Sequence, residues 1–174
     1  LAAFARLGTR RIRLTGGEPL LRKNLTGLAQ RLAALPGIED LSLTTNGTQL
    51  AKHAEGLAKA GVRRINVSLD TLDAARFTAA TRWGDIAKVL EGIYAAKAVG
   101  LHVKINAVAL KGVNEDEFDR MVGWCGEHGF DLCLIETMPL GDVGGDRTDQ
   151  YLPLALVRSR LRQRWTLEES DYRT

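Results

Sequence analysis

The residues with the clearest chemical potential stand where the first strand-like run of the sequence ends. In RIRLTGGEPLLR, residues 11–22, two adjacent glycines, a carboxylate and a proline follow that run. Because glycine lacks a Cβ, Gly16 and Gly17 allow the backbone to approach a ligand closely and expose its N–H and C=O groups. Glu18 adds a fixed acceptor that suits an ammonium group, and Pro19 sets the turn that follows. The same residue types also make plain strand-to-helix turns, so the motif needs support from other parts of the chain.

Five strand-like runs alternate with helical patterns and must position this motif. The runs are RRIRLT (10–15), DLSLTTN (40–46), RRINVSLD (63–70), LHVKINAVAL (101–110) and FDLCLIET (130–137). The helical patterns cover 1–8, 25–35, 50–60, 85–100, 115–129 and 152–165. Most of them stop at or just before a glycine, which accepts the left-handed conformation of a helix end. The repeated strand–helix order predicts a parallel sheet with right-handed crossovers.

Side-chain alternation favours a barrel over an open doubly wound sheet. Alternate residues of a strand point to opposite sides, and four successive runs each have one apolar and one polar face. The polar faces carry Arg11, Arg13, Thr15, Ser42, Thr44, Asn46, Asn66, Ser68, Asp70, His102, Lys104 and Asn106. A doubly wound sheet is covered on both faces and reads as continuous apolar runs. We therefore predict an α/β fold, an incomplete TIM-like parallel (β/α) barrel of about five βα units with a polar lumen. The alternative is a few solvent-facing strands in an incomplete sheet.

The carboxyl ends of the five runs are polar or rich in glycine. They contain TGGEP, TTNG, SLDT, Asn106 and ETMP, and barrel enzymes place their chemistry at these ends. On the polar face, Arg11, Arg13 and Lys104 meet few carboxylates, with Asp70 at the rim. Because a buried cation needs an anion, this arrangement favours a polyphosphate ligand. The alternative is that Arg11 and Lys104 turn out to solvent.

The composition fits one globular domain and argues against several classes of partner. The chain has 174 residues, of which 45% are hydrophobic and 26% charged, enough for a sizeable core. A net charge of +3 with 6% aromatic residues gives no argument for nucleic acid. No apolar run approaches the roughly 20 residues that span a bilayer, and the first residues lack a signal-peptide pattern. We therefore expect a cytoplasmic protein without a membrane partner. Cys125 and Cys133 fit no zinc or redox spacing.

Five motifs together resemble a known family. TGGEPLLR, LTTNG, RRINVSLDTLD, KINAVALKGVN and IETMPLGD occur in this order and at similar intervals in the GTP 3′,8-cyclase family of radical S-adenosylmethionine (radical SAM) enzymes. The likeness covers almost the whole chain. GGEP alone is common to many radical SAM enzymes, whereas RRINVSLD with LTTNG and KGVN is much narrower. The resemblance implies that residues 1–174 form the central part of a radical SAM partial barrel. The chain opens at Leu1 without an initiator methionine, and we expect it to be the middle of a longer protein.

The resemblance also implies a cofactor site, a substrate site and a reaction. The cofactor-binding set it implies for S-adenosylmethionine is Gly16, Gly17, Glu18, Pro19, Ser68 and Met138. The set it implies for GTP is Arg13, Thr44 and Lys104, all three on the polar face. In this family an iron–sulfur cluster reduces the sulfonium, and the resulting 5′-deoxyadenosyl radical takes the 3′ hydrogen of GTP. The ribose carbon then attacks C8 of guanine, which gives (8S)-3′,8-cyclo-7,8-dihydroguanosine 5′-triphosphate in molybdenum-cofactor biosynthesis. No side chain is expected to act as a classical acid, base or nucleophile.

The sequence departs from the family pattern in two respects. The family holds two [4Fe–4S] clusters, one on a Cys-x3-Cys-x2-Cys motif upstream of GGEP and one on three C-terminal cysteines. This chain contains neither set, and cluster ligation needs thiolates. Cys133 and Thr137 also stand where the family usually has arginine and phenylalanine. We therefore expect the chain alone to be inactive and the complete protein, which could be a homodimer, to convert GTP.

Three other functions stay open at this point. A radical SAM enzyme acting on a peptide or another small molecule would keep the cofactor and change the substrate, and Cys133 favours it mildly. A non-catalytic nucleotide-binding module would never have had cluster cysteines. A Schiff-base barrel enzyme would use Lys104 as its amine, although no acid–base set accompanies that lysine in the sequence.

Overall fold

The computed structural model describes residues 1–137 and 150–171, and its centre is one parallel sheet. The strands are β1 (Arg11–Leu14), β2 (Asp40–Thr45), β3 (Arg64–Ser68), β4 (His102–Ala109) and β5 (Asp131–Glu136). They lie in the order β1-β2-β3-β4-β5, and every neighbouring pair is parallel. Consecutive order means that each crossover returns to the next strand, as in a barrel, and the sheet does not reverse direction at a switch point. The predicted α/β arrangement of a partial barrel is confirmed.

The helices follow the predicted pattern with one addition. They are α1 (Ala2–Arg6), α2 (Leu25–Ala33), α3 (Leu50–Lys59), α4 (Ala74–Thr81), α5 (Ile86–Ala98), α6 (Phe118–His128) and α7 (Leu154–Leu161), with a short 3-10 turn at Pro19–Leu21. Helix α4 was not predicted, because Phe77 is its one buried side chain and leaves no periodic signal. Its start is fixed by Asp73, whose carboxylate accepts the Arg76 N–H at 2.8 Å. No helix in the described residues is long and apolar enough to cross a membrane.

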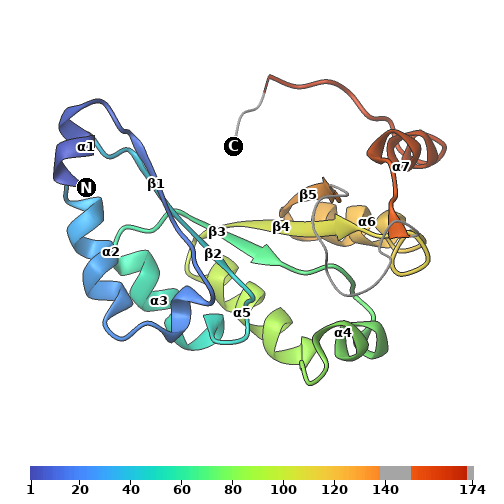
Figure 1. Cartoon of the computed structure of the whole chain (residues 1–174), viewed down its shortest axis with the longest axis horizontal. Helices are drawn as coiled ribbons and strands as arrows, with labels where there is room; N and C mark the ends of the chain where they lie inside the picture. The colour runs from blue at the N-terminus through green and yellow to red at the C-terminus, as the bar shows by residue number, and fades with distance from the viewer. Residues whose placement is uncertain (138–149, 172–174) are drawn as a thin grey trace.

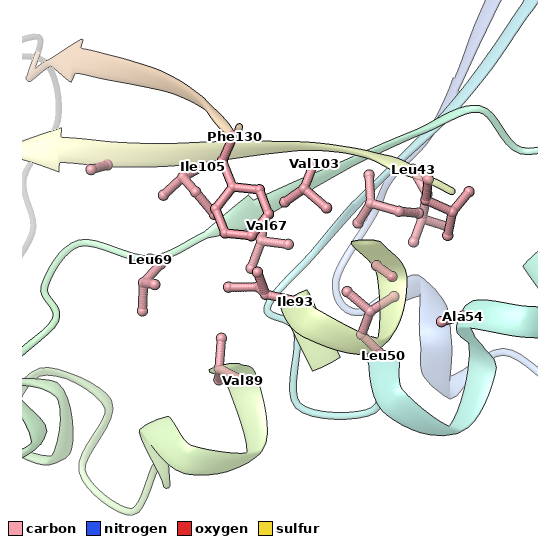
Figure 2. Close-up of a cluster of buried hydrophobic side chains, with 14 of the residues drawn as sticks. Leu43, Leu50, Ala54, Val67, Leu69, Val89, Ile93, Val103, Ile105 and Phe130 are labelled. Carbon is pink, nitrogen blue, oxygen red and sulfur yellow. The ribbon is translucent and has the colours of Figure 1, made fainter. Parts of the chain in front are cut away.

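The sheet has one covered face and one open face. Figure 1 shows α2, α3 and α5 together along one side of the strands. The alternate aliphatic residues of β2, β3 and β4 point to that side and are almost fully buried. Figure 2 shows Leu43, Val67, Val103 and Ile105 of the sheet gathered with side chains such as Ile93 of α5. The polar residues between them point the other way, which confirms the predicted alternation.

Helix α5 packs closely against the start of α3 through a glycine. A Cβ built at Gly92 of α5 would lie 2.7 Å from the backbone oxygen of Gly47 and 2.8 Å from Cβ of Leu50. Neither atom is the end of a flexible side chain, so a larger residue would force the helices apart. The turn that carries Gly47, directly after β2, is thereby held against α5.

Gly92→Ala is expected to lower the free energy of unfolding by about 1–3 kcal/mol, because overpacking shifts backbone atoms. Gly126→Ala in α6 is the matched control, since a Cβ there would meet no atom within 4 Å. It should raise the free energy of unfolding by about 0.5–1 kcal/mol through the better helix propensity of alanine. Urea unfolding of both variants measures the difference, and equal effects would contradict the close packing at Gly92.

Candidate functional site at the carboxyl rim and lumen

The predicted substrate residues lie together on the open face of the sheet. Thr44 of β2, Asn66 of β3 and Lys104 of β4 are register partners and form one row across the lumen. Neighbouring strands are about 4.8 Å apart, so the backbones of Thr44 and Lys104 are separated by about 10 Å. Arg13 lies one row nearer the amino ends, as the register partner of Ser42. The side chains of Thr44 and Lys104 are half-buried, whereas that of Arg13 is exposed.

The lumen carries more negative charge than the sequence pattern predicted. Asp40 at the start of β2 accepts a hydrogen bond from Arg64 at 3.2 Å, and Asp131 at the start of β5 lies 2.8 Å from Nε2 of His102. The expectation that few carboxylates share this face was therefore wrong for Asp40 and Asp131. Asp40 alternates with Ser42 and Thr44 in its own run, so the alternation rule could have found it. Arg64 and His102 consequently find their anions within the chain.

Two arginines of β1 are in a different position. Arg11 and Arg13 point to the open face with exposed side chains, and among the described residues neither makes an ion pair. Arg11 is therefore solvent-exposed, as one alternative had it, whereas Lys104 is half-buried and interacts within the chain. Positive charge without an ion-pair partner among the described residues thus lies on β1, at Arg11 and Arg13.

The glycine pair after β1 leaves room for a ligand. Gly16 has a backbone φ of 143°, which side-chain-bearing residues rarely adopt. Gly17 has no such constraint, and a Cβ at this position would meet no atom of the described chain within 4 Å. Nothing inside the described chain thus requires glycine at position 17. A ligand that comes close to the backbone at this position would require glycine there.

Glu18 ties the end of β1 to the end of β2. Its Oε1 accepts the hydroxyl of Thr45 at 2.6 Å and the N–H of Leu20 at 3.1 Å, and its Oε2 accepts the N–H of Asn46 at 2.8 Å. We call the contacts of Glu18 with Thr45 and Asn46 the Glu18 clamp. The following residues Pro19 and Leu20 are buried beneath it. The turn is therefore held in one conformation beside Gly16 and Gly17.

The same arrangement occurs a second time at the rim. Glu117, at the start of α6, accepts the Thr71 hydroxyl at 2.5 Å on Oε1 and the Leu72 N–H at 3.0 Å on Oε2. We call these contacts the Glu117 clamp. In both clamps the threonine oxygen also accepts the N–H two residues further on, that of Gly47 or of Asp73. Each clamp therefore fixes the loop after a strand with one carboxylate.

The two clamps differ in their charge balance. Glu117 lies 3.0 Å from Arg76 and 2.7 Å from Arg120, so two guanidinium groups compensate its charge. Arg76 also binds Asp116 and lowers the pKa of that carboxyl to about 2. Glu18 has no Lys, Arg or His partner in the described part of the chain. A half-buried carboxylate without a cation is a suitable partner for a ligand that brings positive charge.

Asn114 closes the rim between β3 and β4. This fully buried amide donates to the carbonyl oxygens of Asp70 at 2.7 Å and Val108 at 2.8 Å, and it accepts the Leu110 N–H at 2.9 Å. The Asp70 carboxylate accepts the Val108 N–H at 2.8 Å. Burial raises the pKa of Asp70, and this hydrogen bond only partly opposes the shift. Ser68 lies just before this junction, at the exposed end of β3.

The structure brings most of the predicted site residues to one region. Gly16, Gly17, Glu18 and Pro19 follow β1, and Ser68 ends β3 at the same rim. Met138 lies outside the described residues. Sequence reasoning missed Thr45, Asn114 and Glu117 as residues that shape the rim. The motifs LTTNG and KGVN contain two of them, but their partners stand 27 and 44 positions away and follow only from strand pairing.

The described residues do not provide a metal-cluster site. No three His, Cys, Asp or Glu side chains gather there in a way that could hold a metal ion. Cys125 is buried in α6 on the helical side, where burial raises its pKa to about 12. Cys133 is the register partner of Asn106 on the lumen face of β5. The two thiols thus belong to different layers and do not form a shared ligand set.

The architecture and this rim define a class of protein, a partial parallel α/β barrel with its candidate site at the carboxyl ends of the strands. Residues 1–125 match the Radical SAM superfamily, and the chain belongs to that superfamily. The S-adenosylmethionine-bound crystal structure of Streptococcus suis SuiB has a TM-score of 0.66 to this chain at 24% identity. The match covers 88% of this chain and 35% of SuiB. At that identity the likeness concerns the fold.

Relatives with higher sequence identity are named GTP 3′,8-cyclase. The GTP 3′,8-cyclase of Rhizobium etli (strain CIAT 652) is 53% identical over 175 residues, which are 99% of this chain and 50% of the relative. That of Bradyrhizobium diazoefficiens is 57% identical over 169 residues, which are 95% of this chain and 49% of the relative. The chain therefore spans about half the length of the curated relatives that it matches.

Asp70 should make stability depend on pH. Because its folded-state pKa is raised, the folded chain binds this proton more tightly than the unfolded chain does. Its contribution is fully present below the ordinary aspartate pKa of 3.8 and is lost as pH rises through the raised value. Asp70→Asn keeps an oxygen for the Val108 N–H and should remove this component. Urea unfolding across this pH range tests it, with exposed Glu91→Gln as the control. An unchanged profile in Asp70→Asn would contradict the assignment.

Proposed function

We propose that this chain is the barrel core of a GTP 3′,8-cyclase that binds S-adenosylmethionine at its rim and GTP in its lumen. The observation that carries the proposal is the combination of a sterically open Gly17 with the uncompensated Glu18 carboxylate, directly after the strand that carries the exposed Arg11 and Arg13. The names of relatives at 53–57% identity support the same reaction. The product would enter molybdenum-cofactor biosynthesis.

The rim fits the amino-acid end of S-adenosylmethionine. The exposed backbone around Gly16 and Gly17 can donate to and accept from a ligand, and no side chain of the described residues occupies the space beside Gly17. Glu18 would face the ammonium group, since its charge lacks a partner and its position is fixed by three hydrogen bonds. Ser68 ends its strand on the same rim and would contact the cofactor from the other side. When reduced, S-adenosylmethionine supplies a carbon radical that abstracts hydrogen.

The lumen fits a nucleoside triphosphate. Arg13 is exposed and free of ion pairs within the described residues, and guanidinium groups bind phosphate through paired N–H donors. Thr44 and Lys104 stand in the next row and would add a hydroxyl and an ammonium group to the same ligand. Asp40 and Asp131, which pair with Arg64 and His102, limit where phosphate groups can bind in the lumen, because their negative charge repels phosphate. The phosphates would therefore lie near Arg13, toward the carboxyl end of β1, because Asp40 is the register partner of Arg11 at the other end of that strand.

The side chains of this chain would bind and orient the cofactor and the substrate, and none of them would transfer a proton. Covering helices exclude water from one side of the sheet, and the Glu18 clamp holds the turn at residues 16–19 beside the row formed by Thr44 and Lys104. Such positioning lets a short-lived radical meet one C–H bond of the substrate. The iron–sulfur clusters of the family would be held by residues other than those described here.

One observation keeps a second substrate class in view. Cys133 and Thr137 occupy positions where the family usually has arginine and phenylalanine, and Cys133 lies on the lumen face beside Asn106. The loss of a cation there favours a less charged substrate, such as a peptide. Competition between GTP, other nucleotides and peptides for the lumen would separate the two readings.

A chimaera provides the test of activity. Residues 1–174 would replace the matching segment of the Rhizobium etli relative, which keeps that relative's own ends. With S-adenosylmethionine and a reductant under anaerobic conditions, the chimaera should convert GTP to the 3′,8-cyclic product. The relative itself, measured for the same iron content, is the control. A folded chimaera with full iron content and no GTP turnover would overturn the proposal.

Within that chimaera, Arg13→Gln should raise KM for GTP by about 10- to 100-fold, because it removes charge-assisted hydrogen bonds to phosphate. KM for S-adenosylmethionine should stay within about twofold. Arg31→Gln, an exposed arginine on α2, is the matched control and should alter neither constant. Equal effects of the two substitutions would show that Arg13 acts through surface charge alone.

A further inference from the structure

We propose that Thr45 is a positioning residue for the cofactor site, because its hydroxyl holds the Glu18 carboxylate in the orientation that meets a ligand ammonium group. This inference rests on the proposed function and adds a residue that the resemblance did not assign. Thr45 lies at the end of β2, is 2% exposed, and does not itself reach the open space beside Gly17.

The Thr45 hydroxyl both donates and accepts a hydrogen bond in the Glu18 clamp. Its single proton is donated to Oε1 of Glu18 at 2.6 Å, and its oxygen accepts the N–H of Gly47 at 3.1 Å. The adjacent Asn46 N–H binds the other carboxylate oxygen at 2.8 Å. With one oxygen held by the last residue of β2 and the other by the residue that follows it, the carboxylate is kept from rotating or withdrawing from the rim. Its remaining lone pairs are therefore presented in a fixed direction.

The base of the clamp is rigid. Gly47 is buried with φ of 82°, and a Cβ there would lie 2.9 Å from Val89 and 3.1 Å from Val67. Helix α5 and strand β3 thus hold the turn that carries the Gly47 N–H. The Thr45 oxygen is fixed by this turn, and Glu18 is fixed by Thr45. The hydrophobic core therefore fixes the position of the Glu18 carboxylate through Gly47 and Thr45.

The Glu117 clamp has a similar hydrogen-bond pattern, but its charge is balanced within the chain. It likewise joins a threonine hydroxyl and a backbone N–H to one glutamate, but Arg76 and Arg120 compensate its charge. It joins the loop after β3 to the start of α6, and its charge is balanced by residues of the chain itself. The Glu18 clamp lacks such cations among the described residues, so its charge is left for a partner from outside. The pair therefore offers a matched comparison between a closed clamp and an open one.

The experiment compares Thr45→Val with Thr45→Ser and Thr71→Val. Valine keeps the shape of threonine and removes the hydroxyl, whereas serine keeps the hydroxyl. In the 174-residue chain, Thr45→Val should speed amide hydrogen exchange at Asn46 and Gly47 by about tenfold or more. Thr71→Val should instead speed exchange at Leu72 and Asp73 and leave Asn46 and Gly47 unchanged.

The kinetic arm uses the chimaera with the Rhizobium etli ends. Thr45→Val should raise KM for S-adenosylmethionine about tenfold while kcat and KM for GTP stay within about threefold. Thr45→Ser should restore KM to within about threefold. Thr71→Val should lower Tm by about 2–4 °C and leave KM for S-adenosylmethionine within about twofold. A merely structural role of Thr45 would produce the same pattern as Thr71→Val.

The outcomes separate this inference from the proposed function. Unchanged exchange at Asn46 and Gly47 in Thr45→Val would overturn the inference, because the hydroxyl would then not hold the clamp. Faster exchange with a wild-type KM for S-adenosylmethionine would overturn it as well. If the unmodified chimaera neither turns over GTP nor cleaves S-adenosylmethionine, the proposed function fails and the cofactor role of Thr45 fails with it. If it cleaves S-adenosylmethionine but spares GTP, only the substrate proposal fails.

Discussion

Burial of alternate aliphatic side chains on one face of a parallel sheet is the constraint from which the rest of this structure follows. Residues such as Leu43, Ile65 and Ile105 are withdrawn from water by the helical layer. The side chains between them must then point to the opposite face, where no described helix covers them. That face is free to carry arginine, lysine and amide groups that a two-sided core would exclude. The polar lumen is thus a consequence of how the core is closed.

Consecutive parallel strands also place every strand exit at one edge, and this edge must be held together. Strand pairing fixes the backbones within the sheet but leaves the loops beyond it without partners. Here the loops are joined by carboxylates and an amide, with Glu18 between β1 and β2 and Asn114 between β3 and β4. Glu117 adds the loop after β3 to the start of α6. These contacts satisfy backbone N–H groups that would otherwise depend on water.

Charge balance distinguishes structural carboxylates from those available to a ligand. Asp40, Asp131 and Glu117 each have a cationic or imidazole partner within the chain. Glu18 has its hydrogen bonds but no cation in the described residues, and Arg13 is an exposed cation without an anion there. The unbalanced groups thus lie at the rim and along β1. A ligand with a positive amino-acid end and a second ligand with phosphates would balance both, and this pairing underlies the proposed function.

The sequence by itself determined the strand and helix order, the two-faced strands and the set of glycine and polar residues at the strand ends. These features depend on local periodicity and on neighbours in the chain, and RRIRLT, DLSLTTN and LHVKINAVAL display them directly. It did not reveal α4, whose one buried side chain gives no period. The tertiary structure alone decided which charges are balanced. Asp40 and Arg64 are 24 positions apart, and Thr71 and Glu117 are 46 apart. Such pairs depend on strand register and on helix placement, which the packing of the whole chain fixes, and for this reason the role of Thr45 became visible only in three dimensions.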